Sequence, residues 1–374
     1  MSPTALTWPN VLSWRMERQL LDRPGGLDTV DVVRRLGGVQ AQVASSAAQA
    51  VAVRTASGRA EVPERLADRS LVKTWAQRGT LHLLPADEAG AYLSLLAAAR
   101  FWEKPSWQRS FATTEQIAKL GEAVDHALRD AVLTREELAA AIIEHSGEVE
   151  LGKHLASGWG ALLKPFAWQG LLCNALSDGN RVTFTSPATW LPGWKGLPEP
   201  DVAAAHVVPA YLGAYGPAGM ASFDQWLLRG VTKKPVLRRW FGDLVEAGTL
   251  TEVDVEGERL HARTADLDEL ASTRPAGRVR LLPAFDQYVL GPGTSDKQII
   301  EPARRPLISK AAGWISPVVV VDGRVAGTWT ADGETLAIEL FGEERAPNRD
   351  ALDAEVEVLG KALGRPLAPT LRTI

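Results

Sequence analysis

Apolar residues recur at helical spacing through the first seventy positions of the chain. The pattern predicts four helices there, at 7–21, 29–36, 46–55 and 61–67. Pro24-Gly25-Gly26 is a stop for the first helix, and Asp28 is an entry residue for the second. Ser45 and Ser46 stand before the Ala-rich third segment, so they predict its N-cap.

Strand-forming residues follow these helices. The runs 71–75 and 80–84 flank the turn Gln77-Arg78-Gly79 and predict a hairpin. Helices followed by a hairpin are the order of elements in a winged helix, which usually binds DNA. We therefore expect residues 1–110 to form a first winged-helix module.

The same order of elements returns twice. For the second copy we expect one long helix through Tyr92 and Phe101. Further helices are expected at 114–130, after the capping box Thr134-x-x-Glu137, and at 155–176, and a strand is expected at 181–185. For the third we expect helices at 202–214, 218–228 and 235–246, then a hairpin of 249–255 and 258–262. These copies predict winged-helix modules at 111–190 and 201–272, with a Pro-, Gly- and Trp-rich linker at 187–200.

The last hundred residues carry a different pattern. Strand-like runs stand at 279–283 and at 318–329, where Asp322-Gly323 marks a hairpin turn, and a helix is expected at 352–363. Residues 273–374 therefore predict a β-rich C-terminal domain. The expected fold class is α+β, mainly helical, with three tandem winged-helix modules and this β-rich unit around a DNA-binding cleft.

Composition and charge restrict the possible partners. The chain of 374 residues is long enough for two to four domains, and its 41 basic and 45 acidic residues give a net charge of −4. No global field draws it onto an acidic polymer, so DNA binding needs local basic patches. A single cysteine, Cys173, excludes an internal disulfide. With no signal peptide and no long apolar run, the sequence predicts a soluble cytoplasmic protein without membrane contact.

Two glutamines are the first candidates for chemistry. Gln40 and Gln42 follow the helix stop Gly37-Gly38, and at i and i+2 on an extended segment their amides point the same way. The alternative is that both amides satisfy backbone groups at a helix boundary.

Motifs for other chemistries are missing from the sequence. It has no phosphate-binding loop, no dinucleotide fingerprint, no HExxH and no GxSxG, so it predicts neither a metal nor a cofactor. The six histidines are scattered. His82, in the RGTLHLL hairpin, is a candidate DNA contact that could reach a cleft shared with the glutamines, although a satisfied structural histidine is the alternative.

Positive charge gathers in one short segment. Five basic residues and no acidic residue stand between Leu228 and Trp240: Arg229, Lys233, Lys234, Arg238 and Arg239. They are candidates for contacts with DNA phosphates, and a solvated helix face is the alternative. The thirteen tryptophans could in part stack on bases, although core packing is their more frequent role.

Three stretches together resemble a known family. They are VQAQ after the Gly-Gly stop, KTWAQRGTLHLLPADE, and LLPAFDQYVLG. With the three winged-helix patterns they resemble the winged-helix DNA glycosylases of the AlkZ and YcaQ type, most closely the AlkZ-like enzymes, over essentially the whole chain. The resemblance implies that Gln40 and Gln42 are the catalytic pair. It also implies a monofunctional glycosylase that removes bulky N7-alkylated purines and unhooks interstrand crosslinks of the azinomycin B type, in base excision repair and antibiotic self-resistance.

The chemistry of such lesions suits two neutral amides. An N7-alkylated purine already carries positive charge, so it leaves as a neutral base, and the enzyme need only place a water and support the cationic sugar. Some relatives carry aspartate where this chain has Gln42. That departure suggests substrates with an unusually good leaving group.

A crosslinked base cannot be flipped freely, which favours an open cleft probed by a hairpin. Our candidate probe is the hairpin at 318–329 with Arg324 beside its turn, and a purely structural hairpin is the alternative. The expected partner is damaged double-stranded DNA, bound by a monomer. A winged-helix transcriptional regulator that binds DNA without catalysis is the alternative function, and a DNA-independent scaffold or small-molecule binder is a third class.

Overall fold

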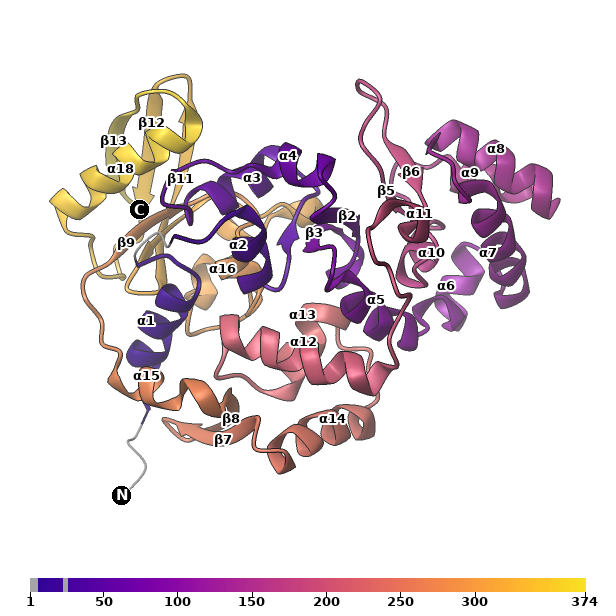
Figure 1. The fold of residues 1–374 in the computed structure, drawn as a ribbon. Coiled ribbons are helices and arrows are strands. Elements are labelled where there is room, and N and C mark those ends of the chain that lie inside the picture. The colour runs from indigo at the N-terminus through magenta and orange to yellow at the C-terminus, as the bar shows by residue number, and fades with distance from the viewer. Residues whose placement is uncertain (1–5, 23–25) are drawn as a thin grey trace. The chain divides into compact units, whose positions relative to one another are not determined.

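The computed structural model describes residues 6–22 and 26–374, and their contacts divide into two compact units. The first unit comprises the chain up to Glu61 and the segments 208–226 and 237–374. The second unit comprises 62–207 and 227–236. Pro24 and Gly25 of the expected helix stop lie outside the described residues. The fold is α+β (Figure 1).

The first unit combines N-terminal helices with most of the second half of the chain. Its N-terminal elements are α1 (Trp8–Arg18), α2 (Thr29–Arg35), β1 (Val39–Gln40) and α3 (Ala44–Ala52). The helices α12 (Pro200–Tyr215), α13 (Met220–Leu228) and α14 (Lys234–Glu246) each run from one unit into the other. The remaining elements are β7 (Leu250–Val255), β8 (Glu258–Arg263), α15 (Leu267–Ser272), β9 (Val279–Leu282), α16 (Gln287–Leu290), α17 (Arg305–Ile308), β10 (Val318–Val321), β11 (Arg324–Asp332), β12 (Thr335–Leu340), α18 (Arg349–Leu363) and β13 (Ala368–Thr373).

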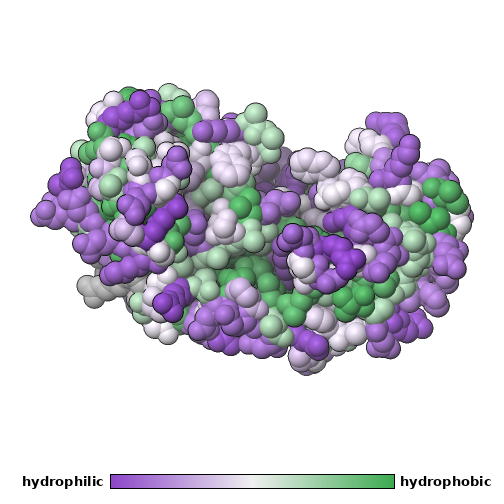
Figure 2. Space-filling view, turned by 90° about the horizontal axis from the view of Figure 1, so that it is seen from above, coloured by the Kyte–Doolittle hydropathy of each residue, from purple (hydrophilic) through white to green (hydrophobic). Residues whose placement is uncertain are grey.

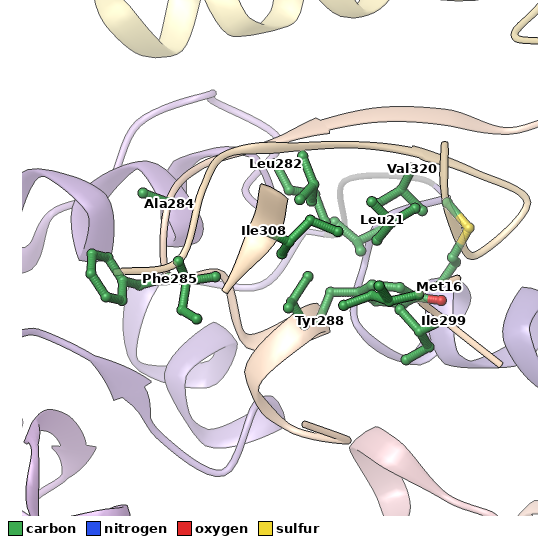
Figure 3. Packing of buried hydrophobic residues seen from close by; sticks show 14 of the residues in the cluster. Met16, Leu21, Leu282, Ala284, Phe285, Tyr288, Ile299, Ile308 and Val320 are labelled. Carbon is green, nitrogen blue, oxygen red and sulfur yellow. The ribbon is translucent and has the colours of Figure 1, made fainter. Parts of the chain in front are cut away.

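The first unit contains a five-stranded sheet in the order β13-β12-β11-β10-β9. Its strands alternate side chains between two apolar layers, as the period of a strand requires. Val318 and Val320 of β10 pack with α1 and α16, whereas Val319 and Val321 face α18. Figure 3 shows the first layer, where Val320 and Leu282 gather with other buried side chains of α1 and α16. The expected β-rich C-terminal region is therefore present as a sheet with both faces covered.

The second unit is built mainly from helices around a small sheet. Its helices are α4 (Val62–Ala67), α5 (Ala89–Ala98), α6 (Pro105–Ser110), α7 (Thr114–Leu128), α8 (Arg135–Ser146), α9 (Gly152–Leu155), α10 (Lys164–Trp168) and α11 (Pro187–Trp190). Its strands are β2 (Leu71–Trp75), β3 (Leu81–Pro85), β4 (Leu133–Thr134), β5 (Cys173–Asn174) and β6 (Thr183–Thr185). The strand order β3-β2-β5-β6-β4 joins the first expected hairpin and the strand expected at 181–185 in one sheet.

Most of the local predictions are confirmed. Three hairpins stand where expected, as β2 with β3, β7 with β8 and β10 with β11. The strand expected at 181–185 is present as β6, but its partner β5 lies inside the segment that was expected to be the helix 155–176. Asp28 caps α2 by accepting a hydrogen bond from the Asp31 amide, and Thr134 and Glu137 form the capping box of α8.

Three helix predictions are wrong in their bounds. The segment 155–176 is not one helix, because Gly160 adopts a left-handed φ of 60° and a Cβ there would stand 2.2 Å from the ring of Trp75. The helix through Phe101 ends earlier, at Ala98, and Arg100 follows it with a φ of 44°. The third helix begins at Ala44 without a side-chain cap, so Ser45 and Ser46 occupy its first turn and are not its N-cap.

The two units do not coincide with the four segments expected from the sequence. The boundary at Glu61 separates the predicted first module into two parts. The number of winged-helix modules and their bounds stay predictions, because grouping residues by their contacts does not test where a winged-helix module begins or ends. On the face shown in Figure 2, hydrophilic residues predominate and apolar residues form small separate patches.

Candidate active site

The candidate glutamines follow a helix that two glycines end. The amide of Gly38 donates to the carbonyl of Val33 at 2.9 Å, and Gly37 and Gly38 have φ values of 62° and 104°. Left-handed backbone at the end of a helix favours glycine, because a side chain would be strained there. The chain leaves this turn directly into β1, which carries Gln40.

The two glutamines differ in exposure. Gln40 exposes only 7% of its surface, and Val39 and Ala41 on either side of it are buried. Gln42 is exposed and lies two residues before α3 begins. The expected extended conformation is present at Gln40, which belongs to a strand. One amide is thus shielded from water and the other is open to it.

A buried ion pair ties the end of α3 to the stretch LLPAFDQYVLG. The Arg54 guanidinium donates to both carboxylate oxygens of Asp286, at 2.7 and 2.8 Å, and both side chains are fully buried. Arg54 also donates to the carbonyls of Gln19 and Ala50, at 3.0 and 2.6 Å. Asp286 in turn accepts a hydrogen bond from the Tyr288 amide and caps α16. The pair therefore connects the stretch LLPAFDQYVLG to the end of the helix that follows VQAQ.

A second link joins the end of the same stretch to the glycine turn. The hydroxyl of Tyr215 donates to the carbonyl of Leu36 at 2.6 Å, one residue before Gly37. The ring of Tyr215 occupies space that a side chain at Gly291 would fill, since a Cβ there would stand 2.1 Å from it. Gly291 thus allows Tyr215 to hold the turn that leads into Gln40.

Sequence reasoning missed Arg54, Asp286 and Tyr215. The available signal was an ionisable residue inside an otherwise apolar run, Asp286 within LLPAFDQYVLG and Arg54 after an Ala- and Val-rich helix. Buried charges are seldom tolerated without a partner, so Arg54 and Asp286 could each have been expected to pair with an opposite charge.

A pocket of about 540 Å³ borders α3 within the first unit. Ser46 and Gln49 of the helix line it together with Lys310, Trp314 and Glu339. Trp314 exposes 43% of its surface, and Phe285 packs edge-on against its ring at 5.0 Å. An exposed indole ring among polar groups offers a surface on which an aromatic group can stack.

His82 is a buried neutral histidine. It is fully buried on β3, and its Nδ1 lies 3.0 Å from the Thr80 carbonyl, so Nδ1–H is the donor. Burial, together with the nearby Arg78, lowers the pKa of His82 to about 3. A cationic contact from His82 to a phosphate does not fit this environment. The geometry favours the alternative of a structural histidine.

The five basic residues of the segment 229–239 are all exposed. Lys234, Arg238 and Arg239 belong to α14, on which i and i+4 positions share a face. Arg229 and Lys233 precede that helix, and Arg229 has a left-handed φ of 61°. Exposure of all five leaves both alternatives open, a phosphate-binding surface and a solvated helix.

Arg324 is engaged by acidic residues of its own unit. Its guanidinium donates to both carboxylate oxygens of Glu344, at 2.9 and 2.6 Å, and this partner raises the pKa of Arg324. The adjacent turn is also packed in place, because Gly323 is buried against Leu12 and its carbonyl accepts from the Tyr288 hydroxyl at 2.8 Å. The geometry favours a structural hairpin over a DNA probe at this turn.

Other kinds of site find no support in the described part of the chain. Within residues 6–22 and 26–374, no three His, Cys, Asp or Glu side chains group in a way that could hold a metal ion. Among the same residues, no helix is both long and apolar enough to cross a membrane.

Comparisons with known proteins agree with the family resemblance. The family described as DNA glycosylase AlkZ-like matches residues 33–362. The chain is 48% identical over 362 residues to the interstrand DNA cross-link repair glycosylase of Streptomyces sahachiroi, covering 96% of this chain and 97% of that protein. It superposes on the structure of the Streptomyces sahachiroi DNA glycosylase AlkZ with a TM-score of 0.94, at 46% identity, covering 99% of this chain and 100% of the other. The chain therefore belongs to the AlkZ-like DNA glycosylase family.

Proposed function

We propose that this glycosylase hydrolyses the N-glycosidic bond of bulky N7-alkylated purines and unhooks interstrand crosslinks. The Streptomyces sahachiroi relative is named for cross-link repair, and 48% identity over nearly the full length of both chains supports the same substrate class. Crosslinks of the azinomycin B type, and a role in antibiotic self-resistance, are the specific case that we propose. Gln40 and Gln42 carry the reaction.

Their different exposure suits two different tasks. Gln40 is shielded from water, where a carbonyl dipole acts on a developing positive charge more strongly than in solvent. It would stabilise the oxocarbenium-like sugar as the neutral base leaves. Gln42 is exposed, so its amide can accept a hydrogen bond from the attacking water and orient it. Neither amide removes a proton, which is consistent with a substrate that already carries its charge.

The main observation behind this proposal is that buried side chains hold the segments on both sides of the glutamine motif. The buried pair of Arg54 and Asp286 fixes the far end of α3, and the hydroxyl of Tyr215 fixes the turn before β1. Catalysis by fixed dipoles requires that they are oriented before the substrate arrives. A surface helix boundary would not need two buried supports from a distant part of the chain.

The experiment measures base release from duplex DNA with one N7-methylguanine, followed by alkali to cleave abasic sites. We expect Gln40→Ala and Gln42→Ala each to lower the single-turnover rate by about 100-fold, as loss of one oriented dipole does. Gln225→Ala, an exposed glutamine on α13, is the matched control and should keep the wild-type rate. A folded double variant that releases base at the wild-type rate contradicts the assignment. Absence of base release together with tight binding to one undamaged sequence would favour the regulator.

The proposal extends to how the enzyme meets DNA. We infer three winged-helix modules, at 1–110, 111–190 and 201–272, and a C-terminal domain at 273–374, around a cleft for the duplex. The exposed basic residues of the segment 229–239 support phosphate contacts. We further propose a monomer in the cytoplasm that associates with the nucleoid.

A further inference from the structure

An aromatic pocket of about 210 Å³ lies within the second unit, and neither Gln40 nor Gln42 is among the residues that line it. Its apolar walls come from the end of α5, from the segment 101–111 and from α10, and they include Leu96, Phe101, Trp107, Phe111 and Trp168. Trp107 and Phe111 pack at 5.0 Å between ring centroids. For comparison, a cavity of about 150 Å³ holds benzene, so this pocket can take a substituted ring or a fused bicyclic ring.

Three cationic residues line the same pocket, and no acidic residue does so among the described residues. They are Arg78, Lys164 and Arg229. Burial and the nearby Arg229 lower the pKa of Lys164, which indicates that the positive charges crowd one another. An anionic group at this position would relieve that repulsion.

Both arginines stand in strained backbone. Arg78 and Arg229 have left-handed φ values of 55° and 61°, and each precedes a glycine that is also left-handed, at 71° and 74°. A non-glycine residue in this region is costly, and such residues cluster at ligand-binding sites. Two separate loops thus each place an arginine at this pocket, and both arginines have a left-handed backbone.

One hydrogen-bond donor in the wall has no partner among the described residues. The Nε1 atom of Trp168 is buried and unpaired, and the whole side chain exposes only 6% of its surface. Its neighbouring Cζ2 lies 3.4 Å from where a Cβ at Gly79 would stand, so this edge of the indole faces a residue that also lines the pocket. A buried N–H without a partner costs stability unless a ligand atom accepts from it.

We propose that this pocket binds one unstacked nucleotide of DNA, with the base between the aromatic side chains and its phosphate on Arg78, Lys164 and Arg229. A nucleobase is a planar ring with acceptor atoms, and one of these accepts from Trp168 Nε1. Aromatic stacking combined with cationic phosphate contacts is how proteins hold unpaired nucleotides. The exposed Lys233 and Lys234 follow the pocket along the chain and offer charge for the adjoining backbone.

This inference rests on the proposed DNA glycosylase function, because it gives that enzyme a second point of contact with a distorted duplex. The same chemistry is present in a free mononucleotide. The two sources are separated by testing a duplex and a mononucleotide as different ligands.

The main experiment compares two labelled duplexes by fluorescence anisotropy at fixed salt, one fully paired and one with a single bulged guanine. We expect wild type to bind the bulged duplex about tenfold more tightly. Ala99→Leu, which fills the pocket from the end of α5, should abolish the preference. Ala98→Leu, on the exposed neighbour, should preserve it. Lys164→Met, which removes a half-buried charge and retains most of the volume, should reduce the preference several-fold.

In a parallel arm, deoxyguanosine monophosphate is titrated against tryptophan fluorescence. Saturable quenching that Ala99→Leu abolishes, with no preference for the bulge, assigns the pocket to free nucleotides. Equal affinity for both duplexes with no quenching overturns the inference, as does a bulge preference that both Ala99→Leu and Lys164→Met retain. Release of N7-methylguanine by wild type is measured on the same preparation, so failure of the pocket is distinguished from failure of the proposed function.

Discussion

The buried pair of Arg54 and Asp286 permits a quantitative test of how the proposed catalytic motif is held. Asp286→Asn keeps the shape of the side chain and can still cap α16, but it leaves the guanidinium of Arg54 fully buried without its counterion. Two charge-assisted hydrogen bonds of 2.7 and 2.8 Å are weakened at once. Removing one partner of such a pair costs about 3–5 kcal/mol, a large part of the stability of an ordinary domain.

Urea unfolding followed by tryptophan fluorescence measures this cost, and a double-mutant cycle isolates the pair. We expect Asp286→Asn and Arg54→Met each to cost about 3–5 kcal/mol, and the double variant to cost less than their sum by about 2 kcal/mol or more. Arg304→Met is the control, because Arg304 forms a similar bidentate pair with Glu343 at the surface, where water screens the charges, so its loss should cost far less than loss of the buried pair.

The same variants test the connection to catalysis. At a temperature where Asp286→Asn remains folded, its single-turnover rate on N7-methylguanine DNA should fall, because α3 and the glutamines before it lose their anchor. Single variants that each cost under about 1 kcal/mol, or effects that simply add, would refute the view that this pair supports the site.

Three further predictions concern other parts of the chain. The pKa of His82 falls from its usual 6.5 to about 3 on folding, so as the pH drops the unfolded chain binds a proton before the folded protein does. The free energy of unfolding should therefore decrease by about 2 kcal/mol between pH 7 and pH 5. Urea unfolding of His82→Asn should lack this decrease. Lys233→Ala combined with Lys234→Ala should lower the slope of log affinity against log salt by about 2 for undamaged duplex, whereas removing an exposed lysine of α18 should leave the slope unchanged. Gly291→Ala should displace the ring of Tyr215 and cost about 1–3 kcal/mol in thermal unfolding, with wild-type stability as the contrary result.

Local patterns in the sequence were sufficient for most of the elements and for the candidate glutamines. The hairpins, the capping box of α8 and the glycine stop before Gln40 depend on residues within a few positions of one another. Backbone preferences at that range act before any tertiary contact forms, so the sequence alone predicts them. The three stretches that carry the family resemblance are equally local.

The tertiary structure alone decided what holds those stretches and which side chains are available. Arg54 and Asp286 are 232 residues apart, and Tyr215 and Leu36 are 179 apart. His82 and Arg324 were candidates for contact with DNA, yet His82 is buried and neutral and Arg324 is bound to Glu344. Burial and pairing are properties of residues brought together from distant parts of the chain, and no local period encodes them. The sequence by itself thus pointed to Gln40 and Gln42 as the candidate catalytic residues, and only the packed structure showed which buried contacts hold the segments around them.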